Sequence, residues 1–98
     1  MVSTKADVIE ILHDNKMILS SFGVYQLGLF GSFLHDQANN ASDIDLIVEF
    51  EPDQKTFTNF SNLIFFLEEI FGRRVEVVTL ESISPHIGPQ ILREVENV

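Results

Sequence analysis

One stretch of the sequence, residues 27–50, constrains the fold more than any other. It reads LGLFGSFLHDQANNASDIDLIVEF, in which a short apolar run leads into Gly31-Ser32 and a second apolar run begins with the aspartates Asp43 and Asp45. Short apolar runs bounded by turn residues are typical of buried strands. The stretch therefore predicts two strands, one that ends in a Gly-Ser turn and one that opens with two carboxylates.

The second strand carries the chemical groups. Side chains along a strand alternate between two faces, so Asp43 and Asp45 share one face while Ile44 and Leu46 lie on the other. Two such carboxylates are roughly 6.6 Å apart along the strand, and their oxygens can converge on ions between them. Mg²⁺ takes few carboxylates together with water and substrate phosphate, so the pattern favours a metal-bound nucleoside triphosphate. The residues alone leave an alternative open, in which Asp43 belongs to the turn and Asp45 is a solvated strand residue.

The Gly-Ser turn adds a second indication. Gly31 permits a sharp reversal of the backbone, and Ser32 can cap a short helix expected over residues 33–38. The N-terminus of a helix holds phosphate through its free N–H groups. No Lys or Arg occurs between Met17 and Gln54, so backbone and metal must neutralise any triphosphate bound here.

These residues resemble a known family. Gly31-Ser32, ten further residues and then the D-x-D of Asp43 and Asp45 look like the G-S-x10-D-x-D signature of the minimal nucleotidyltransferase (MNT) group, within the DNA polymerase β-like superfamily. The likeness extends over most of the chain, including residues 73–98. The resemblance implies a nucleotidyltransferase core with a mixed sheet.

The resemblance also implies a site and a reaction, the transfer of AMP from ATP to a hydroxyl group with loss of pyrophosphate. Asp43 and Asp45 would hold two Mg²⁺ ions, and Gly31 and Ser32 would cradle the phosphates. Family members carry a third carboxylate on a later strand, and Glu76 occupies the matching position, where it would complete one metal site and help to deprotonate the acceptor.

One motif departs from the family pattern. Many members read G-S-x-x-R-G, whereas this chain has His35 and Asp36 in place of the Arg and Gly. Asp36 would add a negative charge beside the expected path of the phosphates.

Farther along the chain, Arg73 and Arg74 are the cations nearest in sequence to Glu76. They can pair with the acidic cluster or with phosphate, or they can be solvated charges at a helix end.

The resemblance implies a partner as well. MNT proteins are generally encoded beside HEPN-domain proteins, so we expect an antitoxin that adenylylates a HEPN ribonuclease toxin, commonly on a tyrosine, within a hetero-oligomer. One alternative is a non-catalytic antitoxin that neutralises the toxin by binding it, which the change at His35 and Asp36 favours. Another is a small-molecule nucleotidyltransferase, although such enzymes usually need a further domain to hold the acceptor.

Composition narrows the remaining possibilities. The 98 residues, 45% of them hydrophobic, predict one domain over residues 1–98. A formal charge of -9 with only six Lys and Arg opposes direct nucleic-acid binding, and the lack of cysteine excludes disulfides and thiolate zinc sites. No apolar stretch approaches the roughly 20 residues of a membrane span and no signal peptide is visible, so the cytoplasm is the expected location.

The order of elements predicts an α/β domain with a small mixed three-stranded sheet and about four helices. The first helix is expected to start at Ser3 or Thr4 and to end at Gly23, followed by strands over residues 24–30 and 43–50. A turn over residues 51–54 precedes a helix over residues 56–71.

Three details of the second half follow from the same pattern. Phe57 is predicted on the buried side of the helix over residues 56–71, while Phe65 and Phe66 can be either core contacts or an exposed patch. A strand over residues 75–79 turns Glu76 away from the core. Breaks at Ser84-Pro85 and Gly88-Pro89, with His86 between them, precede a last helix on which Ile91, Leu92 and Val95 are expected to pack inward.

Overall fold

The computed structural model describes residues 2–82 and 88–98, with Gln90 described in its backbone alone. These residues form α1 (Lys5–Asp14), α2 (Lys16–Ser21), β1 (Val24–Phe30), β2 (Ile44–Phe50), α3 (Phe57–Phe71), β3 (Val75–Thr79), the short 3-10 helix η1 (Leu80–Ser82), α4 (Gly88–Glu94) and β4 (Glu96–Asn97). The break predicted at Ser84-Pro85 with His86 lies outside the described residues. None of the helices in the described part is both long and apolar enough to cross a membrane.

The strands form one mixed sheet in the order β3-β2-β1-β4. β1 runs antiparallel to both β2 and β4, whereas β2 and β3 are parallel and are connected through α3. The predicted α/β class with a mixed sheet is confirmed. The predicted count of three strands is one too few, because β4 is only two residues long and is defined by its pairing with β1 rather than by a pattern of its own.

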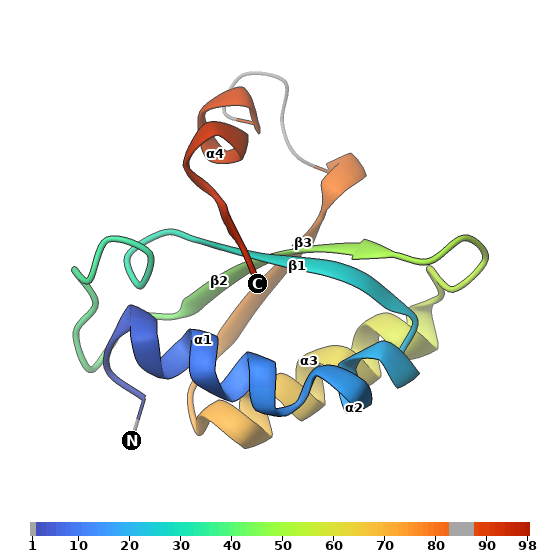
Figure 1. Cartoon of the computed structure of the whole chain (residues 1–98), viewed down its shortest axis with the longest axis horizontal. Helices are drawn as coiled ribbons and strands as arrows, with labels where there is room; N and C mark the ends of the chain where they lie inside the picture. Colours follow the sequence, from blue (N-terminus) through green and yellow to red (C-terminus); the bar gives the residue numbers. More distant parts are fainter. Residues whose placement is uncertain (1, 83–87) are drawn as a thin grey trace.

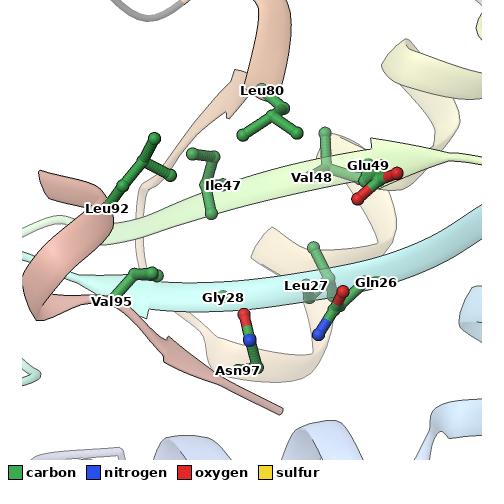
Figure 2. Close-up of a pocket in the computed structure, with 10 residues that line it drawn as sticks. All are labelled: Gln26, Leu27, Gly28, Ile47, Val48, Glu49, Leu80, Leu92, Val95 and Asn97. Atoms are coloured by element: carbon green, nitrogen blue, oxygen red, sulfur yellow. The ribbon is translucent and has the colours of Figure 1, made fainter. Parts of the chain in front are cut away.

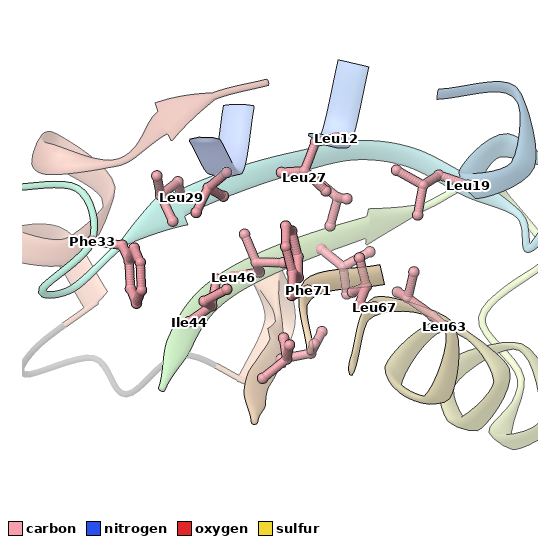
Figure 3. Packing of buried hydrophobic residues seen from close by; sticks show 14 of the residues in the cluster. Leu12, Leu19, Leu27, Leu29, Phe33, Ile44, Leu46, Leu63, Leu67 and Phe71 are labelled. Atoms are coloured by element: carbon pink, nitrogen blue, oxygen red, sulfur yellow. The ribbon is translucent and has the colours of Figure 1, made fainter. Parts of the chain in front are cut away.

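The two faces of the sheet differ in what covers them. Figure 1 shows α1, α2 and α3 on one side of the sheet and α4 on the other. Figure 3 shows side chains of β1 and β2 meeting those of α3 in the core, among them Leu29, Leu46, Leu67 and Phe71. Because side chains alternate along a strand, the residues between these core positions point to the opposite face. That face carries the carboxylates described below.

The first helix begins as predicted but does not run on to Gly23. Thr4 accepts a hydrogen bond from the Asp7 N–H at 3.1 Å, and Asp7 accepts one from the Thr4 N–H, which completes a capping box. The helix is interrupted at Asn15, whose side-chain amide donates to the Ile11 carbonyl at 2.8 Å. A side chain that takes over a helical carbonyl competes with the next helical turn, so the chain restarts as α2.

The short helix predicted over residues 33–38 is wrong, since the chain forms a series of turns there. The Leu34 N–H donates to the Gly31 carbonyl and the Gln37 N–H donates to the Ser32 carbonyl, at 3.1 and 2.9 Å. Asp36 adopts a positive φ of 53°, which a helix cannot accommodate. Phe33 is fully buried beneath these turns and anchors the segment to the core.

The helix predicted over residues 56–71 is confirmed, with Thr56 as its N-cap and Gly72 as its C-cap. The burial predicted for Phe57 is wrong, because this first helical residue is 86% exposed. Of the two interpretations left open for Phe65 and Phe66, core contact applies to Phe66 and exposure applies to Phe65. Phe66 packs on Phe22 with ring centroids 5.5 Å apart, whereas Phe65 is exposed.

The last helix also differs in one contact. Ile91 and Val95 are partly buried, whereas Leu92 lines a cavity with Ile47 of β2 but remains 47% exposed, so its predicted inward packing is only partial. The helix is held to the sheet through the strand that follows it, since the Val98 N–H donates to the Leu27 carbonyl at 2.9 Å.

Candidate active site

The Gly-Ser turn and the second aspartate are brought together by the pairing of β1 with β2. Phe30 lies opposite Asp45 in the register, so Gly31 follows directly beside that carboxylate. Gly31 has a φ of 78°, and a Cβ placed on it would overlap the carboxylate oxygen of Asp45 and lie 2.9 Å from its Cγ. Glycine is therefore required twice here, for the left-handed backbone and for the close approach.

A matched pair of substitutions separates these two requirements. Gly31→Ala should destabilise the fold by roughly 1–3 kcal/mol through crowding, with about 1–2 kcal/mol more for the left-handed backbone. Gly72 has a similar φ of 63°, but nothing lies within 4 Å of the position that a Cβ would occupy there. Gly72→Ala should therefore lose only the backbone contribution. Urea unfolding measures both, and equal losses would show that the contact between Gly31 and Asp45 carries no weight.

The third carboxylate reaches the same place from the neighbouring strand. β2 and β3 are parallel with Asp45 opposite Glu76, and Glu76 is exposed while Val75 and Val77 face the core. The pKa of Asp45 is raised to about 6, first by burial and then by a hydrogen bond to Glu76 and the charges of Glu76 and Asp43. Negative charge is thus concentrated at this point of the sheet.

Asp43 stands slightly apart from the other two. It precedes the first paired residue of β2 and is partly buried, and its charge acts on Asp45. Across residues 2–82 and 88–98, no three acidic or histidine side chains already converge on one metal position. The donor chemistry nevertheless fits Mg²⁺, because it prefers carboxylate oxygens and would relieve the crowding of charge that raises the pKa of Asp45.

The two residues that depart from the family pattern are both engaged elsewhere. The Asp36 carboxylate accepts a hydrogen bond from the Lys5 N–H at 2.8 Å, at the first turn of α1. Helix N-termini favour negative charge, so this carboxylate has a local partner. His35 Nε2 lies 3.3 Å from Glu94 Oε2 of α4, and both side chains are about half exposed. Neither contact could be read from the sequence, because the partners are 31 and 59 residues away.

Arg73 is partly buried and uses its guanidinium to hold backbone carbonyls. Its Nη1 donates to the carbonyls of Asn39 and Ser42 at 2.9 and 2.8 Å, and its Nη2 donates to the Val2 carbonyl at 3.1 Å. The guanidinium carbon also lies 5.0 Å from the centroid of the Phe33 ring. Sequence reasoning missed this role, since it considered acidic groups, phosphate or solvent around Arg73 but not backbone carbonyls.

A small apolar cavity lies on the same face of the sheet as Asp45. Figure 2 shows it between Ile47 of β2, Leu80 of η1, and Leu92 and Val95 at the C-terminal helix. Its volume is about 60 Å³, whereas pockets for small molecules usually have at least about 300 Å³. As bounded by the described residues, the cavity is too small to accept a nucleoside.

Comparisons with known proteins agree with this architecture. The family model of the nucleotidyltransferase domain matches residues 10–97. The protein adenylyltransferase MntA of Thermococcus cleftensis is 36% identical over 80 residues, which are 82% of this chain and 80% of the relative.

Two solved structures are similar as well. One assigned as a minimal nucleotidyltransferase has a TM-score of 0.84 and 26% identity, and the match covers 97% of this chain and 96% of the other. A toxin-antitoxin structure with AMP-PNP has a TM-score of 0.65 over 95% of this chain and 70% of the other. At 24% identity, the second likeness concerns the fold alone.

Proposed function

This chain belongs to the nucleotidyltransferase domain family, and from that premise we propose that it is an antitoxin that adenylylates its toxin. It transfers AMP from ATP to a hydroxyl group, which we take to be a tyrosine of a HEPN ribonuclease. The observation that carries the proposal is the meeting of three features at one point: the Gly31 turn, the Asp45 carboxylate beside it and Glu76 on the adjoining strand. The similarity to a protein adenylyltransferase supports the class of reaction.

Each residue has a part in the proposed reaction. Asp43 and Asp45 would hold two Mg²⁺ ions, with Glu76 completing one site, and bound Mg²⁺ supplies Lewis-acid stabilisation of the phosphoryl oxygens. Gly31 and Ser32 hold the β- and γ-phosphates through their backbone and hydroxyl groups. The absence of Lys and Arg between Met17 and Gln54 leaves this task to uncharged donors.

The transfer itself is an in-line displacement at the α-phosphorus. The acceptor hydroxyl gives its proton to Glu76, and its oxygen forms a bond to the α-phosphorus while the bond to pyrophosphate breaks. Glu76 suits this part because it is exposed and β3 lies at the end of the described sheet order. A hydroxyl on a second protein can therefore approach it from outside the sheet.

A non-catalytic antitoxin is the second candidate. It is favoured by the observation that no three acidic side chains in the described residues already converge on one metal position. Such a protein would neutralise its partner by covering it, which requires contact area rather than metal.

One experiment separates the two functions. The proposed HEPN partner is co-purified with this chain and incubated with ATP and Mg²⁺, and its intact mass is measured. The enzyme should add about 329 Da for each AMP group transferred, and fragmentation should place the group on a tyrosine. A parallel incubation with EDTA serves as the control and should leave the mass unchanged. An unchanged mass with Mg²⁺ present, in a complex that still suppresses the ribonuclease, would establish the non-catalytic function instead.

A further inference from the structure

We propose that Arg73 is a positioning residue that sets Asp43 in place relative to the Gly31-Ser32 turn. It does so by tying the loop before Asp43 to the segment that follows the turn. The inference rests on the proposed function, because it assigns Asp43 to the metal site of the transfer reaction. It concerns a residue whose hydrogen bonds in the described part of the chain go to backbone carbonyls and not to the Asp43 carboxylate.

The first part of the argument is the pair of hydrogen bonds from Arg73 Nη1. One goes to the Asn39 carbonyl at 2.9 Å and the other to the Ser42 carbonyl at 2.8 Å. The Ser42 carbonyl belongs to the peptide group that joins Ser42 to Asp43. Because a peptide group is planar, holding its oxygen also restrains the backbone N–H of Asp43 and the direction in which that residue leaves the loop.

The loop cannot position itself. The Asn39 N–H donates to Ser42 Oγ at 2.9 Å, the Ala41 N–H donates to Asn39 Oδ1 at 2.8 Å, and the Ser42 N–H donates to the Asn39 carbonyl at 3.1 Å. These bonds give residues 39–42 a defined shape, but all of them stay inside the loop. Its placement against the rest of the molecule therefore depends on contacts such as those of Arg73.

The guanidinium of Arg73 also lies over the ring of Phe33, the residue that follows the Gly-Ser turn. Its carbon lies 5.0 Å from the centroid of the Phe33 ring, which is fully buried and comes two residues after Gly31. A third bond goes to the Val2 carbonyl at 3.1 Å. The guanidinium of Arg73 thus contacts both segments of the motif: Phe33, two residues after Gly31, and the carbonyl of Ser42, directly before Asp43.

Arginine is required for this arrangement by its shape. A planar guanidinium can donate to several carbonyls in one plane and stack on an aromatic ring at the same time, which the compact ammonium of lysine cannot do. Arg74 carries the same charge one residue later, but its side chain is exposed. Arg74→Lys is therefore a matched control for Arg73→Lys, because both replace a planar guanidinium by an ammonium of the same charge.

The test compares Arg73→Lys with Arg74→Lys by two measurements that need no AMP transfer. The first is the affinity for Mn²⁺, used in place of Mg²⁺, at a temperature well below unfolding. Arg73→Lys should weaken it at least about tenfold, as expected when an outer group that orients a metal ligand is changed, whereas Arg74→Lys should leave it within about twofold. The second is hydrogen exchange of the Ser42 amide in metal-free protein. It should become faster in Arg73→Lys alone, because Arg73 holds the Asn39 carbonyl to which this amide donates.

A double-variant cycle distinguishes positioning of Asp43 from a general structural effect. In an Asp43→Asn background, Arg73→Lys should weaken Mn²⁺ binding no further, because the ligand that it positions has already been removed. A tenfold loss that persists in this background would overturn the proposal. So would an unchanged exchange rate of the Ser42 amide in Arg73→Lys.

The unaltered chain provides a measurement that does not depend on any variant folding. The Nη protons of Arg73 should give resolved NMR signals that exchange slowly with water, with through-space contacts to residues 39–43. Averaged Nη signals without those contacts would overturn the proposal. If the unaltered chain binds no Mn²⁺, the proposed function fails, while the Nη signals and the Ser42 exchange still decide whether Arg73 holds the loop.

Discussion

The double variant Asp43→Asn, Asp45→Asn should fold and yet transfer AMP at least about a thousandfold more slowly than the unaltered chain, at the upper end of what loss of one electrostatic group costs. Asparagine keeps the volume of aspartate but lacks the charge that Mg²⁺ requires. Ile44 and Leu46, which lie in the core behind the two aspartates, are fully buried and unaffected. The rate at which the proposed partner protein gains mass measures the loss.

Protection of cells from the proposed toxin decides what this loss of transfer means. If catalysis neutralises the toxin, the double variant should fail to protect cells even though it is folded and present at the normal level. If binding neutralises the toxin, protection should persist, since the contact surface is intact. Full protection by a well-folded double variant would therefore exclude adenylylation as the means of neutralisation.

The stability of the metal-free double variant provides its folding control. The pKa of Asp45 is raised from its ordinary value of 3.8 to about 6, first by burial and then by Glu76 and Asp43. Between these two values the folded state keeps a proton that the unfolded state has released, so stability falls as pH rises through this window. The double variant lacks this carboxyl group, and its urea midpoint should vary less with pH over the same range.

Glu76→Gln should slow AMP transfer at least about a hundredfold, the lower range for losing a general base. The side chain is exposed and the neighbouring Val75 and Val77 hold β3 to the core, so the fold should remain intact. Intact-mass kinetics of the partner at saturating ATP measure the effect. Because Glu76→Gln also removes one negative charge beside Asp45, its control must remove one negative charge elsewhere on the same face of the sheet.

Glu49→Gln is that control. Glu49 lies on the same strand and the same face as Asp45, four residues farther along, and it is partly buried. Its removal should change the transfer rate less than about threefold, because at roughly 13 Å along the strand it is beyond contact with the site. Near-normal transfer by Glu76→Gln, or an equal loss in both variants, would remove Glu76 from the mechanism.

The parts of the fold that the sequence predicted well are those governed by local pattern. The alternation in β2 and the helix predicted over residues 56–71 both depend on neighbouring residues. The errors arise where a particular side chain or a distant partner decides. Asn15 interrupts a continuous helical pattern by bonding to the Ile11 carbonyl, and β4 exists only because it pairs with Gly28 and Leu29.

The candidate site divides in the same way. Gly31, Ser32, Asp43 and Asp45 stand in a recognisable spacing, and the position of Glu76 followed from the family likeness. Their assigned roles remain predictions. The contacts of Asp36 with Lys5 and of Arg73 with the loop at Asn39 and Ser42 could not be predicted, because side-chain bonds to a distant backbone leave no periodic signal. From the sequence we expect Asp36 to repel the phosphates and consider Arg73 as a partner for them, but each has a different partner in the structure.

The parallel pairing of Asp45 with Glu76 also determines when the site comes into being during folding. β1 and β2 are consecutive strands that pair antiparallel, whereas β3 pairs with β2 in parallel across the intervening α3. Long-range parallel pairing of this kind is intrinsically slow, because loop closure costs entropy before the contacts repay it. This late step also pushes two carboxylates together against their mutual repulsion. The barrier to completing the sheet thus includes an electrostatic component, which a divalent cation present during folding would lower.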